Sequence, residues 1–215
     1  MSEEEAVEAF IAARLPLMPV HALPHILLHQ ATPASGLAQL DSALGADEDA
    51  APYWAHRWGG GLALAQWIAA FPQEVAGRRV LDLGCGSGIV GIAAALAGAA
   101  EICAVDCDPR AIVATRMNAR ANHIPVQATC ADPLDGPVPD VDLLLVGDLF
   151  YNAGLALRTA GFLEHCHQAG IAVIVGDPFR APLPLDRMEP IARFPAAEYA
   201  GQSPVPVGGV FRWRG

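Results

Sequence analysis

One stretch decides the fold: Val80-Leu81-Asp82-Leu83-Gly84-Cys85-Gly86-Ser87-Gly88. Its apolar first part, 80–83, predicts a buried strand, and three glycines follow at alternate positions. The next segment, 89–97, is rich in alanine and aliphatic residues and predicts a helix. A strand, a glycine turn and a helix form the opening unit of a doubly wound nucleotide-binding sheet. Glycine suits the turn because the backbone must bend tightly and then lie directly against a ligand.

The spacing Gly84-x-Gly86-x-Gly88 indicates which ligand to expect. The dinucleotide fingerprint G-x-G-x-x-G matches only out of phase, at Gly86-x-Gly88-x-x-Gly91, which would place Asp82 inside a buried strand where a bare carboxylate is unfavourable. Read in phase, Asp82 ends the strand and faces the cleft. A carboxylate there suits a ligand with an ammonium group and suits a pyrophosphate poorly. We therefore expect S-adenosylmethionine, and the stretch closely resembles the first motif of the class I methyltransferases.

Strands and helices are expected to alternate along the rest of the chain. Further strands are predicted at 101–106, 126–130, 141–148 and 171–176, and helices at 62–71, 109–122 and 154–167. This alternation predicts an α/β fold with a doubly wound, mainly parallel sheet that helices cover on both faces. The end of the chain predicts a short helix at 184–192 and an antiparallel edge hairpin formed by 193–200 and 207–214.

The start of the chain is expected to differ from this pattern. A helix that begins at Ser2 and ends before Pro16 precedes an extended, proline-interrupted segment at 17–28, and 41–52 is expected to be a loop. Residues 1–50 are therefore interpreted as an N-terminal helical and extended appendage. Residues 51–215 are expected to form the S-adenosylmethionine-binding domain.

Composition excludes several classes of protein. The chain has 215 residues, of which 53% are hydrophobic, so one domain with a sizeable core is expected. The net charge of −10 opposes nucleic-acid binding and favours a cationic substrate patch. No segment approaches the ~20 continuous apolar residues of a membrane span, and the acidic start fits neither a secretory signal nor an arginine-rich transit peptide. Five cysteines indicate reduced thiols of a cytoplasmic protein, and their spacing supports no metal site.

The last residues of the predicted strands are candidate ligand contacts, because ligands of such sheets bind at the carboxyl ends of the strands. Asp106 ends the second strand and is expected to accept both ribose hydroxyls. Asp132 follows the third strand, at a position that commonly meets the adenine amino group in class I methyltransferases. Gly84, Gly86 and Gly88 are expected to lie against the cofactor.

Asp148 ends the fourth strand and is followed by Leu149-Phe150-Tyr151, and this position is expected to face the transferable methyl group. The Asn/Asp-Pro-Pro-Tyr/Phe sequence usual in methyltransferases of nucleobase or amide nitrogen is missing here. A carboxylate followed by two aromatic residues suits an amine, which the acid can orient and the rings can hold through cation–π attraction. Lysine has a pKa of about 10.4, so a partly desolvated pocket is needed to supply the neutral amine. We expect Asp148 and Tyr151 to be catalytic, and Phe150 and Tyr151 to contact the substrate.

Three segments together resemble a narrower family: Pro52-Tyr53-Trp54-Ala55 with Trp58, Asp148-x-Phe150-Tyr151, and Gly176-Asp177-Pro178-x-Arg180. They are similar to the electron-transfer flavoprotein beta-subunit lysine methyltransferases, from residue 52 to the end. The resemblance implies protein-lysine N-methylation of that flavoprotein subunit. It also implies that Trp58, Asp82, Gly84, Asp106 and Asp148 contact the cofactor or the target amine, and that Asp177 and Arg180 contact the substrate. Gly59 departs from the proline that often follows the tryptophan in this family.

Other functions remain open at this stage. The same fold could methylate a ribosomal protein or a small-molecule amine. A partner protein that binds the cofactor without catalysis would keep the glycine motif but would not need Asp148 and Tyr151. A dinucleotide oxidoreductase is the most distant alternative.

Overall fold

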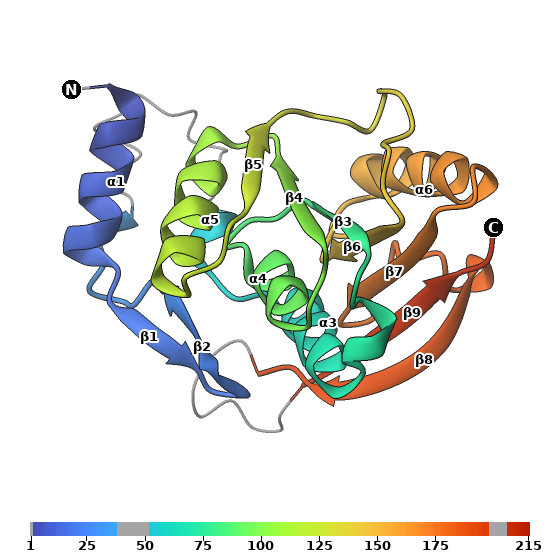
Figure 1. Cartoon of the computed structure of the whole chain (residues 1–215), viewed down its shortest axis with the longest axis horizontal. Helices are drawn as coiled ribbons and strands as arrows, with labels where there is room; N and C mark the ends of the chain where they lie inside the picture. Colours follow the sequence, from blue (N-terminus) through green and yellow to red (C-terminus); the bar gives the residue numbers. More distant parts are fainter. Residues whose placement is uncertain (1, 38–51, 198–205) are drawn as a thin grey trace.

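The computed structural model describes residues 2–37, 52–197 and 206–215. Within them, seven strands form one twisted sheet in the order β5-β4-β3-β6-β7-β9-β8 (Figure 1). The parallel strands are β3 (Arg79–Leu83), β4 (Glu101–Asp106), β5 (Gln127–Cys130), β6 (Leu143–Gly147) and β7 (Ala172–Asp177). The main helices are α3 (Gly59–Ala70), α4 (Ile89–Leu96), α5 (Pro109–Ala121) and α6 (Ala153–Gln168). The expected doubly wound, mainly parallel α/β sheet is therefore confirmed.

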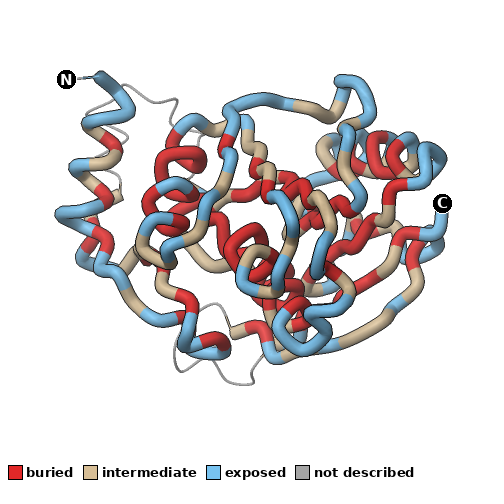
Figure 2. The backbone as a smooth tube through the Cα atoms, in the orientation of Figure 1, coloured by how far each residue is buried: buried red, intermediate tan, exposed pale blue. Residues whose placement is uncertain are grey.

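Successive side chains along a strand point to opposite faces of the sheet. Apolar side chains therefore lie on both faces of this sheet, and helices cover both. On β3, Val80 packs in one core with α3 and α4, whereas Leu81 and Leu83 pack in a second core with α6. On β6, Leu145 belongs to the first core and Leu144 to the second. The central strands are consequently buried on both faces (Figure 2).

The N-terminal segment packs against α5 at one side of the sheet (Figure 1). Helix α1 (Glu3–Arg14) begins with the expected capping box, because Ser2 and Glu5 exchange side chain-to-backbone hydrogen bonds. The extended segment predicted at 17–28 forms a two-stranded antiparallel hairpin of β1 (Leu17–Val20) and β2 (Leu23–His29). Short 3₁₀ turns lie at Tyr53–Ala55, Pro72–Glu74 and Leu185–Arg187. The loop expected at 41–52 lies outside the described residues except for Pro52.

The C-terminal edge hairpin is confirmed, but its first strand starts earlier than expected. Strands β8 (Met188–Pro195) and β9 (Val207–Trp213) are antiparallel, and β9 also pairs antiparallel with β7. The helix expected at 184–192 is wrong except for one 3₁₀ turn. Pro190 suits β8 because an edge strand has an unpaired side on which no backbone N–H is needed. Within the described ranges, no helix is long and apolar enough to cross a membrane.

Candidate cofactor and active site

A cavity of about 440 Å³ opens at the carboxyl ends of β3, β4 and β6. This is where open α/β sheets bind their ligands. Residues from several elements line this cavity. They include Tyr53, Trp58, Gly84, Gly86, Asp106, Asp132, Asp148, Tyr151 and Arg180. The structure therefore brings most of the sequence-predicted site residues to one cavity.

The glycine turn supplies backbone to this cavity at Gly84 and Gly86. Gly86 has a φ of 51°, in the left-handed region that favours glycine, and a Cβ there would meet nothing closer than 3.9 Å. The space over Gly86 is thus open. Gly88 lies elsewhere: it is the N-cap of α4, and a Cβ on it would lie 3.0 Å from the Thr115 methyl carbon. Gly88 was expected to lie against a cofactor, but it does not line the cavity.

The expectation that Asp82 faces the cleft is wrong. Asp82 is only 1% exposed and does not line the cavity. Its side chain points to the face that α4 covers, where Oδ2 accepts a hydrogen bond from the Gly91 amide at 2.8 Å. Asp82 therefore satisfies an amide in the first turn of α4. Burial raises the pKa of Asp82 to about 7.

Asp106 and Asp132 both line the cavity, in different electrostatic settings. Asp106 accepts hydrogen bonds from the amides of Gly86, at 2.9 Å, and Asp108, at 3.0 Å, and burial raises its pKa. Asp132 forms an ion pair with Arg158 of α6 at 2.8 Å, and the hydrogen bond from Arg158 lowers the pKa of that carboxyl group. Asp106 is consequently the acid that the glycine turn itself positions.

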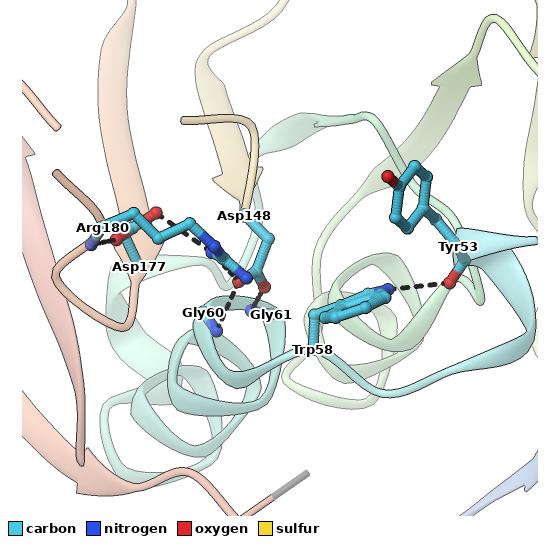
Figure 3. A network of polar contacts seen from close by, with 7 residues as sticks. All are labelled: Tyr53, Trp58, Gly60, Gly61, Asp148, Asp177 and Arg180. Atoms are coloured by element: carbon cyan, nitrogen blue, oxygen red, sulfur yellow. Dashed lines mark hydrogen bonds and ion pairs between the residues drawn. The ribbon is translucent and has the colours of Figure 1, made fainter. Parts of the chain in front are cut away.

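Asp148 lies at the centre of a polar network at the ends of β6 and β7 (Figure 3). Its two carboxylate oxygens accept hydrogen bonds from the amides of Gly60, at 3.0 Å, and Gly61, at 2.5 Å. The Arg180 guanidinium forms an ion pair with the same carboxylate. The backbone of Asp148 has a φ of 60°, which is uncommon for a residue other than glycine. The start of α3 and a guanidinium thus jointly fix the carboxylate.

The three glycines after Trp58 serve this contact. We expected α3 to begin at residue 62, but Gly59, Gly60 and Gly61 form its first turn. A Cβ on Gly60 would lie 2.3 Å from the Gly176 carbonyl oxygen and 2.8 Å from the Asp148 carboxyl carbon. Glycine is needed here because the helix start contacts the backbone of β7 directly. The glycine run thus allows the helix to approach the backbone of the protein itself.

Of the two residues expected to contact substrate after β7, Arg180 lines the cavity and Asp177 does not. Asp177 is fully buried and does not line the cavity, so the expected substrate contact is corrected. Its Oδ1 accepts a hydrogen bond from the Arg180 amide at 2.7 Å, and its Oδ2 lies 3.3 Å from the Arg180 guanidinium. Burial raises the pKa of Asp177. Asp177 therefore positions Arg180, which does line the cavity.

The aromatic residues of the site are a different set from the predicted one. Phe150 is fully buried in the core beneath α6, so its expected contact with substrate is also corrected. Tyr151 lines the cavity and is 47% exposed. Sequence reasoning missed Tyr53, whose ring centroid lies 5.4 Å from that of Tyr151 and 5.6 Å from that of Trp58. The Trp58 indole also donates a hydrogen bond to the Tyr53 carbonyl at 2.8 Å (Figure 3).

We call Tyr53, Trp58 and Tyr151 the aromatic trio. Within the described part of the chain, no group of three or more His, Cys, Asp or Glu residues could hold a metal ion. All five cysteines are free thiols. Carboxylates, the guanidinium groups of Arg158 and Arg180, aromatic faces and backbone groups line the cavity.

Solved structures identify the fold. A Pyrococcus horikoshii protein proposed to be an RNA methyltransferase aligns with 82% of this chain and 97% of its own, at 18% identity and a TM-score of 0.57. The magnesium protoporphyrin IX methyltransferase of Synechocystis, with bound S-adenosylmethionine, aligns with 71% of this chain and 76% of its own, at 15% identity and a TM-score of 0.51. The chain has the class I methyltransferase fold. The sheet order and the glycine turn after β3 agree with this fold.

Sequence comparisons connect this class I methyltransferase fold to protein methylation. The family model "Ribosomal protein L11 methyltransferase (PrmA)" matches residues 64–147. The electron transfer flavoprotein beta subunit lysine methyltransferase of Danio rerio is 45% identical over 132 residues, which are 60% of this chain and 51% of that protein. The chain thus spans about half the length of this relative, and the resemblance expected from the sequence motifs is confirmed.

The buried carboxyl group of Asp82 predicts a pH-dependent stability. The unfolded pKa is the ordinary 3.8 and the folded pKa is about 7, so the folded state favours the protonated acid. The contribution of protonated Asp82 to the free energy of unfolding is complete below pH 4 and is lost as the pH rises through 7. Asp82→Asn keeps an acceptor for Gly91 but does not ionise. We expect the variant to gain up to about 4 kcal/mol over wild type between pH 4 and pH 8, since each pKa unit corresponds to about 1.4 kcal/mol.

Urea unfolding of both proteins at several pH values measures this difference, and every titration that the two proteins share cancels. Unfolding free energies that stay parallel from pH 5 to pH 8 would contradict the predicted ionisation of Asp82.

Proposed function

We propose that the chain is an S-adenosylmethionine-dependent protein-lysine N-methyltransferase that acts on the electron-transfer flavoprotein beta subunit. The observation that carries the proposal is that a single cavity brings together Asp106, Asp148 and the aromatic trio. The sequence similarity to enzymes named for this reaction supports the same substrate.

The cavity fits the proposed cofactor. The open space over Gly86 admits a ligand against the backbone, and Asp106 offers carboxylate oxygens at the end of β4 for ribose hydroxyls. Asp132 lies beyond it at the end of β5, on the side assigned to the adenine. Trp58 and Asp148 line the side assigned to the methionyl group. When bound, S-adenosylmethionine supplies an electrophilic methyl group on a sulfonium.

The target amine is proposed to enter between the rings of the aromatic trio. Tyr53 and Tyr151 are about half exposed, at 49% and 47%, so their faces are accessible from outside the cavity. Aromatic faces attract ammonium groups, and the net charge of −10 adds attraction over a longer distance. The lysine of a protein substrate therefore meets an aromatic opening on a chain of negative net charge.

Asp148 is proposed to orient the amine, assisted by Tyr151. A carboxylate has about four acceptor positions, and the donors at Gly60, Gly61 and Arg180 use three of those on Asp148. One more donor can bind. Because three fixed donors hold this group, it acts by position and hydrogen bonding, which suits a step whose acceleration comes mainly from alignment. Partial desolvation in the cavity favours the neutral amine that attacks the methyl group.

A ribosomal protein is the second candidate substrate. The family model of ribosomal protein L11 methyltransferases matches residues 64–147, which include the glycine turn and the whole of β6. This match covers the region proposed to bind the cofactor, which enzymes with different substrates can share. It supports the reaction type more than it supports the substrate.

One experiment compares the two substrates. The purified chain is incubated with S-adenosylmethionine and either the flavoprotein beta subunit or ribosomal protein L11, and each substrate is examined by intact mass spectrometry. We expect mass gains in steps of one methyl group on the flavoprotein subunit, located to lysine by fragmentation. Methylation of L11 alone would replace the proposed substrate, and no methylation of either protein would contradict the proposed activity.

Asp148→Ala should lower the rate of methyl transfer by at least about 100-fold, because the amine loses the group that aligns it. Single-turnover rates with the flavoprotein subunit measure the loss, and circular dichroism checks that the variant is folded. Asp140→Ala is the matched control, since Asp140 is 94% exposed and pairs with Arg79. Equal rates for both variants would remove Asp148 from the mechanism.

Tyr53→Ala should raise the KM for the protein substrate about tenfold, because the mouth of the cavity loses an aromatic face. The KM for S-adenosylmethionine should change little, and initial-rate measurements separate the two constants. Phe71→Ala serves as the control, since Phe71 is 41% exposed but does not line the cavity. An unchanged KM for the protein substrate would show that the amine does not enter past Tyr53.

A further inference from the structure

One buried face of α5 carries polar side chains that the proposed mechanism does not use. Thr115, Asn118 and Asn122 follow one another at spacings of three and four residues, so they share a face of the helix. Thr115 is 1% exposed and Asn118 is fully buried. Buried polar groups need hydrogen-bond partners, and the partners of these residues lie in two separate segments of the chain.

The first segment is the glycine turn of residues 84–88. Thr115 Oγ1 donates a hydrogen bond to the Gly86 carbonyl at 3.1 Å, and Asn118 Nδ2 donates one to the Ser87 carbonyl at 2.8 Å. Two consecutive carbonyls are thus directed toward α5. Because a trans peptide holds a carbonyl and the next N–H on opposite sides, the Ser87 N–H is directed away from α5.

Gly86 is held from two directions. Its amide donates to Asp106, the acid proposed to bind ribose, and its carbonyl accepts from Thr115. The two peptide units that meet at Gly86 are therefore held separately, one by an acid of the proposed cofactor site and the other by a residue behind the turn.

The second segment is the N-terminal hairpin. Asn118 Oδ1 accepts a hydrogen bond from the His29 amide of β2 at 2.8 Å. Asn122 accepts from the Leu27 amide at 2.9 Å and donates to the Leu27 carbonyl at 2.7 Å. The two asparagines therefore bind the backbone of β2 much as a neighbouring strand would. Of the two, Asn118 also binds the glycine turn.

We infer that Thr115 and Asn118 are positioning residues for the glycine turn, and that Asn118 couples this turn to the N-terminal hairpin. The inference rests on the proposed function, because the ligand of the turn is the proposed cofactor. It gives residues 17–29 a part in cofactor affinity, although they lie outside the region that the family model matches. Neither Thr115 nor Asn118 lines the cavity, so both act through the backbone of the turn.

Calorimetry of the full chain with S-adenosylhomocysteine tests Thr115 first. Thr115→Val keeps the shape of the side chain and removes the donor to Gly86, so we expect about tenfold weaker binding. Thr115→Ser keeps the donor and should retain most of the affinity. Equal dissociation constants for Thr115→Val and the wild-type protein would overturn the inference. So would a Thr115→Ser variant that binds S-adenosylhomocysteine as weakly as Thr115→Val does.

Asn118→Ala and Asn122→Ala form the second pair. Both remove bonds to β2 and should lower the free energy of unfolding, but only Asn118→Ala removes a bond to the glycine turn. We expect about tenfold weaker cofactor-product binding for Asn118→Ala and less than about threefold for Asn122→Ala. The KM for S-adenosylmethionine should rise in the same order, while the KM for the protein substrate stays constant.

Equal weakening by the two asparagine variants would overturn the role of Asn118 as a positioning residue for the turn, because the effect would then follow from loss of the hairpin contact alone. If Asn118→Ala does not fold, the Thr115 pair still decides whether the turn is positioned from α5. If the wild-type chain does not bind S-adenosylhomocysteine, the proposed cofactor itself is overturned. If the wild-type chain binds it and the variants bind it equally well, only the positioning inference is overturned.

Discussion

The carboxylate of Asp148 joins three segments that are far apart in the sequence. It accepts amide hydrogen bonds from the start of α3 and pairs with the guanidinium of Arg180 in the loop after β7. An anion at a helix N-terminus is stabilised by the unpaired amides and by the helix dipole. Trp58 is the N-cap of α3. The contact between Asp148 and the start of α3 therefore also fixes the position of Trp58 in the aromatic trio. The shape of the cavity thus depends on one charged side chain and the glycines that let a helix approach it.

The framework of the site could be predicted from the sequence because it is encoded locally. A strand, a glycine turn and a helix follow one another directly at residues 79–96, and Asp106 ends the next strand. Parallel strands bring their carboxyl ends to one edge, so the last residues of β4 and β6 had to lie near each other. The strand ends and the residue types that follow them indicated Asp106, Asp148 and Tyr151, and all three line the cavity.

The rest depended on contacts between distant segments. Asp82 precedes the glycine turn, but one residue along a strand changes the face to which a side chain points, and its face is the one that α4 covers. Phe150 and Tyr151 are adjacent and aromatic, yet one is in the core and the other at the cavity. Tyr53 reaches the site only because α3 starts at Gly59, which requires the contact with Asp148. No local pattern contains that information.

A crystal structure of the chain with S-adenosylhomocysteine tests the central claim most directly, namely that this cavity holds a sulfonium methyl donor beside an amine entrance. The account predicts electron density for the ligand over Gly86, with the ribose hydroxyls at Asp106 and the sulfur directed toward Asp148 and the aromatic trio. Density at another place on the molecule, or a cavity at Gly86 that stays empty at saturating ligand, would contradict it.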